Sequence, residues 1–323
     1  MSLYSFLTGK IRVLEKDLLN QMDVDRMVDA PDFDAAFKAL NDTDYGSHLL
    51  NVDPTQFKQA LDSETRSVRD LMLQWIEEPA LLEFMFIKFD AHNIKLYLKA
   101  KTTGQDAAIT DEYASPSGLT DPSLIKKIIL DDDSETVIHP TTDQMWKEVR
   151  DRLGSEPTGF QIDSVVDLVM FEIMNERVNK VPGPIVRHLY QIQRETALVK
   201  TFVRGKLLGT PAAELKLVLP DEYLKHYDLD LEQAAEILPI EVKVKKALVN
   251  YIENKRLWEF EKELEEAELA VIREAKYATS GPMPAVGYFY AKQSAVRNLR
   301  MILTAKMNGI PAEEIKPRVR QLY

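Results

Sequence analysis

The fold of this chain is decided by the segment from Pro79 to Gly104, PALLEFMFIKFDAHNIKLYLKAKTTG. Proline is tolerated at the first position of a helix, because its missing N–H has no partner there. Glycine is favoured just beyond the last position, where the chain often turns left-handed. The segment therefore predicts one helix of about 24 residues, roughly 36 Å long at about 1.5 Å per residue.

The same interval of 25 residues between a proline and a glycine occurs twice more. Pro184 precedes Gly209 and Pro284 precedes Gly309, so successive copies lie 105 and 100 residues apart. With 16 prolines and 12 glycines among 323 residues, chance predicts about 0.6 such pairs in the whole chain. The intervals therefore indicate one helical unit used three times.

Aligning the copies on their glycines reveals an apolar stripe at steps of three and four residues, typical of a helix packed against neighbours. The stripe consists of Phe84, Ile87, Ala91, Ile94 and Leu98; Leu189, Ile192, Thr196, Val199 and Val203; and Phe289, Lys292, Val296, Leu299 and Leu303. Lys292 alone breaks the pattern clearly. We favour a long stem that snorkels out at the edge of the stripe; the alternative is a contact that only the third copy makes.

Basic residues flank the stripe at two positions. Nine residues before the glycine stand Lys95, Lys200 and Arg300, and three residues before it stand Lys101, Lys206 and Lys306. The second set lies in the last helical turn, where a cation offsets the negative end of the helix dipole. The first set has no such local explanation, and it is either a solvated basic edge or a surface that faces a partner.

Four residues before the glycine only small side chains occur, namely Ala100, Gly205 and Ala305. Glycine costs about 1 kcal/mol relative to alanine in a helix interior. Gly205 therefore predicts a close approach by a second helix on the side away from the stripe.

Helical spacing continues upstream of each repeated helix, in the segments 24–40, 64–77, 143–153, 162–179 and 242–278. The last segment has a slip in its apolar spacing near Lys255, so it is either one curved helix or two in tandem. Its outer face carries six glutamates between Glu259 and Glu268. We expect a solvated face there, with docking to a basic partner as the alternative. No alternating pattern of useful length appears, so we predict an all-α fold.

The spacing of the copies predicts three helical repeat domains, spanning residues 1–112, 113–217 and 218–323. A chain of 323 residues suits two or three domains of about 100 to 150 residues each. The polar stretch 105–123 contains Ser115-Pro116-Ser117-Gly118 and is the best linker candidate.

Composition excludes several classes of protein. A net charge of −11 argues against a nucleic-acid partner, which needs a surplus of lysine and arginine on one face. The absence of cysteine removes disulfide and thiol chemistry. No run approaches the roughly 20 apolar residues of a membrane span, and the first 20 residues hold too many charges for a signal peptide. We expect a soluble or peripheral protein.

The sequence offers no catalytic, cofactor-binding or metal-binding motif. Its five histidines are scattered, with none of the spacings typical of metal sites. Glycine-rich phosphate loops and the Gly-x-Ser-x-Gly elbow do not occur. Asp131-Asp132-Asp133-Ser134-Glu135 lacks the central glycine and spaced ligands of a calcium loop, so we expect a polar turn. We therefore predict a protein that is not an enzyme and has no cofactor and no small-molecule substrate.

Several stretches resemble the C subunit of the prokaryotic V-type (A-type) ATPase, the counterpart of the d subunit in the eukaryotic vacuolar enzyme. The last repeated helix, Tyr290–Pro311 (YAKQSAVRNLRMILTAKMNGIP), is the most specific part, and Asp90–Gly104 (DAHNIKLYLKAKTTG) is similar. Asp44-Tyr45-Gly46 and the opening residues 4–19 also resemble that family. One motif departs from repetition: Asp90 and Asn93 become Glu195 and Leu198 in the second copy, and Ala295 and Asn298 in the third.

The resemblance implies a funnel of three similar helical domains with pseudo-threefold symmetry. It further implies a non-catalytic rotor protein, peripheral on the cytoplasmic side of the membrane. One face would sit on the membrane proteolipid ring and the opening would receive the D and F proteins of the central stalk. We expect Lys95, Lys200 and Arg300 to line a surface that faces these partners.

Two alternatives remain from the residues alone. One is a helical-repeat adaptor or scaffold unrelated to rotary ATPases, which would bind extended peptides rather than stalk proteins. The other is an enzyme with a site in a central cavity, which a tight and specific small-molecule ligand would reveal.

Overall fold

The computed structural model describes residues 3–48, 53–106, 110–279 and 281–323, and every regular element in these ranges is helical. The predicted all-α fold class is confirmed for this part of the chain. The linker candidate 105–123 includes residues 107–109, which lie outside the described residues.

The three repeated helices are present where the proline and glycine positions predict them. They are α5 (Pro79–Thr103), α10 (Pro184–Leu208) and α16 (Met283–Met307), each of 25 residues. Gly104 and Gly209 both have φ +65° and cap their helices, and Gly309 has φ +68° one residue beyond the Asn308 cap of α16. The left-handed backbone that favours glycine thus ends each copy.

The described residues form two compact units. The first combines residues 1–77 with residues 256–323, and the second is the continuous stretch 78–255. The division into domains 1–112, 113–217 and 218–323 stays a prediction, and so does the funnel.

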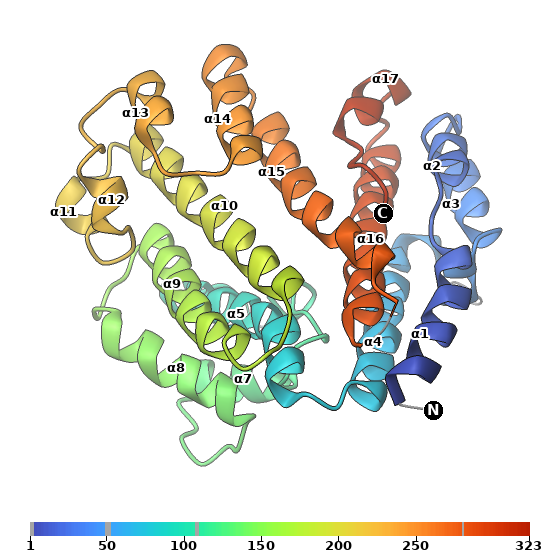
Figure 1. Cartoon of the computed structure of the whole chain (residues 1–323), viewed down its shortest axis with the longest axis horizontal. Helices are drawn as coiled ribbons and strands as arrows, with labels where there is room; N and C mark the ends of the chain where they lie inside the picture. The colour runs from blue at the N-terminus through green and yellow to red at the C-terminus, as the bar shows by residue number, and fades with distance from the viewer. Residues whose placement is uncertain (1–2, 49–52, 107–109, 280) are drawn as a thin grey trace. The chain divides into compact units, whose positions relative to one another are not determined.

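The first unit brings the beginning and the end of the chain together. Its helices are α1 (Leu3–Leu14), α2 (Gln21–Val28), α3 (Phe33–Asn41), α4 (Phe57–Trp75), α15 (Leu257–Ile272), α16 and the short α17 (Ala312–Ile315). Short 3-10 turns at Glu15–Asp17, Asp44–His48, Pro54–Gln56, Arg273–Tyr277 and Lys316–Arg318 join them. The helices α4 and α16 pack side by side (Figure 1). A single apolar core links α2, α3, α4 and α16.

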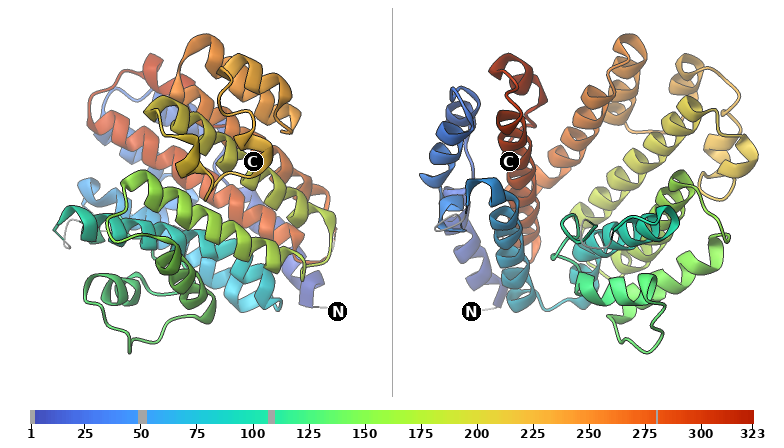
Figure 2. Two further views of the ribbon diagram at one scale, coloured as in Figure 1. Left: turned by 90° about the vertical axis from the view of Figure 1, so that its left-hand side faces the viewer. Right: turned by 180° about the vertical axis from the view of Figure 1, so that it is seen from behind.

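The second unit is built around two of the repeated helices. It contains α5, α7 (Pro122–Leu130), α8 (Pro140–Arg152), α9 (Gly159–Val178), α10, α11 (Ala212–Leu215), α12 (Asp221–Leu224), α13 (Leu231–Ile237) and α14 (Val242–Asn254). Among the described helices, α5 and α9 make the most extensive contact, and α10 packs against both α9 and α14 (Figure 2).

Of the two alternatives for residues 242–278, the structure shows two helices in tandem. Lys255 has φ +59°, a left-handed conformation that ends α14, and α15 begins at Leu257. The segment 242–278 is therefore two helices in tandem, and the slip in its apolar spacing coincides with the boundary between the units.

The apolar stripe faces the interior in all three copies. Every stripe residue from Phe84 to Leu303 is buried, including Lys292 at 2% exposure. Gly205 is also closely approached, as predicted, although by side chains: a Cβ at this position would lie 3.0 Å from Leu215 of α11 and 2.9 Å from the Tyr227 hydroxyl.

The repeated helices pair in a fixed order. The helix α5 packs against α9, which leads into α10; α10 packs against α14, which stands upstream of α16. The series is completed by α16, which packs against α4, the helix that leads into α5. Each long helix therefore contacts the upstream part of the following copy, and the third contacts that of the first.

Candidate functional site

The three predicted partner-binding residues lie on separate helices. Lys95 is on α5 and Lys200 on α10 in the second unit, whereas Arg300 is on α16 in the first. The Lys95 Nζ donates to Asp167 of α9 at 2.7 Å, and the Arg300 guanidinium donates to Asp62 of α4 at 2.7 Å. Lys200 forms no hydrogen bond or ion pair with the residues that the structure describes.

The position of these acids follows the repeat. Asp62 and Asp167 each stand 42 residues before their own glycine, Gly104 and Gly209. The corresponding position before Gly309 is Ala267, which carries no charge. Lys95 and Arg300 are therefore each paired with an aspartate of the following copy. Lys200 has no such partner, because the equivalent position is an alanine.

The second set of basic residues does more than offset a helix dipole. Lys101 donates to the Ile129 carbonyl at 2.7 Å, and Lys306 donates to the Ala30 carbonyl at 2.6 Å. Lys206 donates to the Leu229 carbonyl. All three lysines thus tie the end of a long helix to a carbonyl in another segment. Their equal spacing from the glycine is the sequence signal, but it does not identify the acceptors.

Two asparagines clamp the chain onto the long helices. The Asn93 side chain donates to the Ser115 carbonyl at 2.9 Å and accepts from the Ser115 N–H at 2.8 Å. Asn298 makes the same pair of bonds with the backbone of Arg320, at 3.0 and 2.9 Å. Each partner lies 22 residues after its asparagine. The asparagine therefore has the same clamping role in two copies.

The second copy cannot form this clamp. Its equivalent of the asparagine is Leu198, and the residue 22 positions later is Pro220. Proline has no N–H to donate, so an asparagine here would lose half of its bonding. The departure from the motif that we noted in the sequence is thereby explained physically.

The prediction that Lys292 snorkels to the surface is wrong. Its Nζ lies 2.6 Å from a Glu64 oxygen and 3.0 Å from an Asp44 oxygen, and 4.2 Å from the centre of the Tyr45 ring. Glu64 is itself 6% exposed. The lysine therefore makes a contact that the other copies lack, because a buried ammonium is stable only when it is paired.

This cluster shifts the pKa values of its members. Burial alone would lower the pKa of Lys292, but Tyr45, Glu64 and Tyr288 outweigh it and hold the pKa above its ordinary value. Burial raises the pKa of the Tyr288 hydroxyl to about 12, and burial also raises that of Tyr45. Lys292 is therefore charged and both tyrosines are neutral near pH 7.

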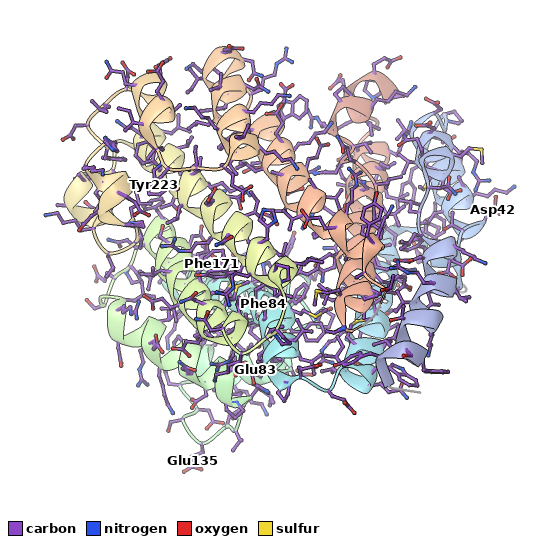
Figure 3. The ribbon with its side chains drawn as sticks, in the orientation of Figure 1. Asp42, Glu83, Phe84, Glu135, Phe171 and Tyr223 are labelled. Carbon is purple, nitrogen blue, oxygen red and sulfur yellow. The ribbon has the colours of Figure 1, made fainter. Side chains whose placement is uncertain are left out.

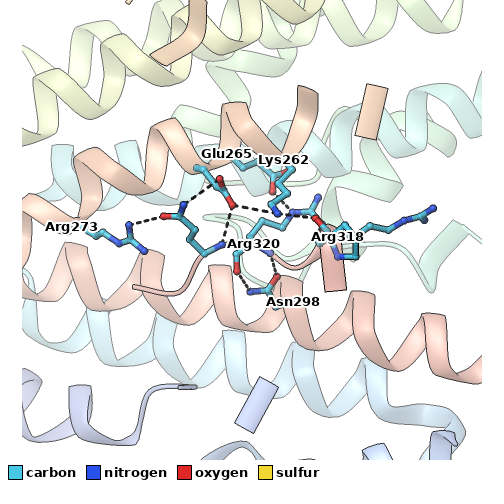
Figure 4. Close-up of polar contacts among 9 residues, drawn as sticks. Lys262, Glu265, Arg273, Asn298, Arg318 and Arg320 are labelled. Atoms are coloured by element: carbon cyan, nitrogen blue, oxygen red, sulfur yellow. Dashed lines mark hydrogen bonds and ion pairs between the residues drawn. The ribbon is translucent and has the colours of Figure 1, made fainter. Parts of the chain in front are cut away.

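The sequence led us to expect that the glutamates of α15 form a solvated face, but some of them make contacts within the chain. Glu265 lies 2.8 Å from Arg320 and 2.9 Å from Arg297, and the Glu266 carboxylate accepts from the Gln321 N–H at 3.2 Å (Figure 4). These contacts hold residues 316–323, which we call the terminal strap. Part of the acidic face is thus used within the chain.

The expected polar turn at residues 131–135 is confirmed. Asp132 has φ +52° and pairs with Lys101 at 2.6 Å, and Asp133 accepts from the Glu135 N–H at 3.0 Å. In the described ranges no group of three or more His, Asp or Glu side chains is arranged to hold a metal ion. No described helix is long and apolar enough to cross a membrane.

Comparison with known proteins bears directly on the resemblance. The chain is 24% identical to the C subunit of the A-type ATP synthase of Methanocaldococcus jannaschii, over 97% of this chain and 85% of that protein. It is 23% identical to the C subunit of the V-type sodium ATPase of Enterococcus hirae, over 99% of both. The C subunit of the A-type ATP synthase of Archaeoglobus fulgidus is 22% identical, over 97% of this chain and 95% of that protein. The model of the ATP synthase (C/AC39) subunit matches residues 7–318, so the resemblance is confirmed and the chain belongs to the ATP synthase (C/AC39) subunit family.

Proposed function

We propose that this chain is a non-catalytic rotor protein of a V/A-type rotary ATPase, which links the foot of the central stalk to the membrane proteolipid ring. Its stalk partners would be the D and F proteins, and it would be peripheral on the cytoplasmic side. Torque would pass through it between ATP chemistry and ion translocation. Family membership supports this role, since the relatives are named as the C subunit of an ATP synthase or of a sodium ATPase.

The pairing order of the long helices carries the proposal. Each long helix packs against the upstream part of the following copy, and α16 packs against α4 of the first. This order is what three repeats would need to close around an axis as a pseudo-threefold funnel. A closed arrangement of long helices suits a spacer that must turn as one body.

Paired polar groups along these helices support a mechanical role. Lys95 with Asp167 and Arg300 with Asp62 join neighbouring helices at equivalent heights. The lysines before each glycine tie helix ends to carbonyls elsewhere. Such directional bonds resist sliding of one helix along another more specifically than apolar packing does.

The decisive experiment is removal and replacement of the chain in the assembled ATPase. We expect the depleted complex to keep hydrolysing ATP while ion transport is lost, and we expect added purified chain to restore transport. Transport that survives depletion, or a purified chain that ignores the D and F stalk proteins and binds extended peptides instead, would contradict the proposal.

Lys200 is the sharpest test of the proposed partner-facing surface. It has no ion pair among the described residues, so Lys200→Glu reverses a charge without breaking an internal contact. We expect weaker assembly with the stalk proteins at physiological ionic strength. Lys95 needs a different design, the exchange Lys95→Asp with Asp167→Lys, which reverses the charge and keeps the pair. Unchanged assembly in both variants would show that Lys200 and Lys95 do not contact the stalk partners.

A further inference from the structure

A cavity of about 590 Å³ lies in the second unit, between α9, α10 and α12. Its walls include Leu168 and Phe171 of α9, Tyr190 and Leu198 of α10, and Pro239. This volume falls within the range of about 300 to 1,000 Å³ that is usual for ligand sites. Figure 3 labels Phe171 on α9 and Tyr223 on α12, both beside α10.

The cavity occurs where the second copy departs from the first. In the first copy Asp90 accepts from the Leu119 N–H at 3.1 Å, the Thr120 N–H at 3.2 Å and the Thr142 hydroxyl at 2.7 Å. These bonds, with the Asn93 clamp, hold the following loop on α5. In the first copy, both carboxylate oxygens of Asp90 therefore accept hydrogen bonds from within the chain.

The equivalent carboxylate of the second copy has spare bonding capacity. Glu195 accepts one hydrogen bond within the described chain, from the Glu241 N–H at 2.8 Å. The clamp is absent, because Leu198 replaces the asparagine. Glu195 and Leu198 both line the cavity, so the second copy places a carboxylate with spare bonding capacity in the cavity wall.

A buried hydroxyl in the wall also lacks a partner. Tyr223 is 1% exposed, and its hydroxyl has no hydrogen bond within the described part of the chain. Buried polar groups are nearly always bonded, so an orphan in a cavity wall indicates a missing partner. Its ring is fixed by Phe202, at 6.3 Å between centres.

The charge of the lining favours a cation. Glu172, Glu195 and Glu222 line the cavity, against the single guanidinium of Arg194. Glu172 is paired with Arg152 at 2.7 Å, whereas Glu195 and Glu222 have no ion pair with the described residues. Negative charge therefore remains in excess.

Two aromatic rings complete the wall. Phe171 and Tyr190 lie edge to face, 6.3 Å between centres. Aromatic faces attract cations, most strongly where water is excluded, and they also pack against alkyl chains. Carboxylates beside apolar and aromatic walls are the features that recognise a charged group on an aliphatic stem.

We propose that this cavity binds an aliphatic cation, an ammonium or guanidinium group on an alkyl chain. The charged group binds Glu195 and the Tyr223 oxygen, and the stem lies against Phe171 and Leu198. Such a group is carried by a lysine or arginine of a partner protein, and also by free polyamines.

The test is a titration of the full chain with agmatine, followed by the methyl NMR signals of Leu168 and Leu198. We expect saturable shifts, with binding weakened about tenfold in Glu195→Gln because a charge-assisted bond is lost. Arg194→Gln should tighten binding, since it removes a competing cation. Glu214→Gln is the matched control, because Glu214 is an exposed glutamate of the same unit outside the cavity lining.

The capped peptide Ac-Ala-Arg-Ala-NH2 distinguishes the two sources. Binding of both probes assigns the site to a protein side chain, and binding of agmatine alone assigns it to a free amine. Absent shifts, equal binding to Glu195→Gln, or saturation by butyrate at the same concentrations would overturn the proposal. Should Glu195→Gln fail to fold, Tyr223→Phe keeps the ring and must still weaken binding. The measurement uses the isolated chain and so does not depend on the proposed rotor function.

Discussion

A buried charge replaces a buried apolar contact at one place in the repeat. Lys292 stands at the position of Ile87 and Ile192, and Glu64 stands at the position of Val169 and Leu269, counted from the glycines. All of these residues are buried. The third copy thus pairs with the first through an ammonium and a carboxylate, where the other copies have apolar residues on both helices.

This exchange predicts opposite results for single and double substitutions. Lys292→Ile alone leaves Glu64 buried without its partner and should cost about 3 to 5 kcal/mol of unfolding free energy. Lys292→Ile with Glu64→Val restores the apolar pair of the first copy and should be neutral or stabilising. Urea denaturation followed by circular dichroism measures both.

The control for this pair is Lys147→Met, which breaks the exposed pair between Lys147 and Asp143. Exposed pairs of this kind contribute about 0.5 kcal/mol or less. If the double variant is as unstable as the single variant, an apolar pair cannot replace the ion pair, and the prediction is wrong.

Sequence reasoning at this scale found the exception but not its cause. The apolar stripe identified Lys292 as a breach, yet its partners Asp44 and Glu64 lie at the other end of the chain. Helical periodicity reports only which residues share a face. The same limit applies to Lys95 and Arg300, whose acids could be recognised only after the helix pairing was known.

At the scale of elements, proline and glycine positions predicted the long helices to within about a residue. The segment 24–40 was less well predicted, because it is broken into α2 and α3 at Pro31. Asp32 caps α3 by accepting from the Ala35 N–H at 2.8 Å, a local signal that apolar spacing alone does not contain.

The terminal strap predicts a pH-dependent contribution from Glu265. Burial opposes ionisation, but Arg297 and Arg320 outweigh it and hold the pKa of Glu265 below its ordinary value of 4.5. A lowered pKa contributes stability above the unfolded value, and this is lost as pH falls through the folded value. Glu265→Gln should therefore cost about 2 kcal/mol at pH 7.

That cost should shrink as pH falls from about 4.5 through the lower pKa of the folded state, because Glu265 is protonated first in the unfolded chain and only then in the folded one. Urea midpoints of the two proteins between pH 7 and pH 3 provide the comparison. A gap that stays constant over this range would show that the stability comes from packing rather than from charge.

The junction of α14 and α15 predicts a stabilising substitution. Lys255 has φ +59°, a conformation that costs a residue with a Cβ roughly 1 kcal/mol and costs glycine little. Lys255→Gly should therefore raise the melting temperature by a few degrees. Glu253→Gly, inside α14, should lower it by a similar amount, and a destabilised Lys255→Gly would contradict the argument.

At the scale of the whole molecule, each of the three long helices packs against an upstream helix of another copy. Repeat proteins usually need atypical terminal repeats that cover an exposed apolar face. Here α16 packs against α4, so the last copy covers the first. The three long helices could be predicted from the sequence. The grouping of residues 1–77 with 256–323 could not, because it depends on contacts between distant segments.

This grouping predicts the outcome of cleavage between the units. With protease sites inserted after Glu77 and after Lys255, we expect residues 1–77 and 256–323 to remain associated after both cuts. Size-exclusion chromatography with mass spectrometry detects the pair. Cleavage at an inserted site after Ser155, within the second unit, serves as the control, and separation of 1–77 from 256–323 would contradict the division.

The joining of the two chain ends in one unit has a consequence for biosynthesis. Residues 1–77 leave the ribosome before the second unit, whereas the helices in residues 256–323 that complete their core follow it. At about 5 to 20 residues per second, the 178 intervening residues take roughly 10 to 35 s to synthesise. During that time Val24, Phe37, Leu40 and Phe57 lack the part of their core that residues 295–315 supply. The segment 1–77 therefore keeps part of its apolar surface uncovered until residues 256–323 are made, and the second unit can fold before the first.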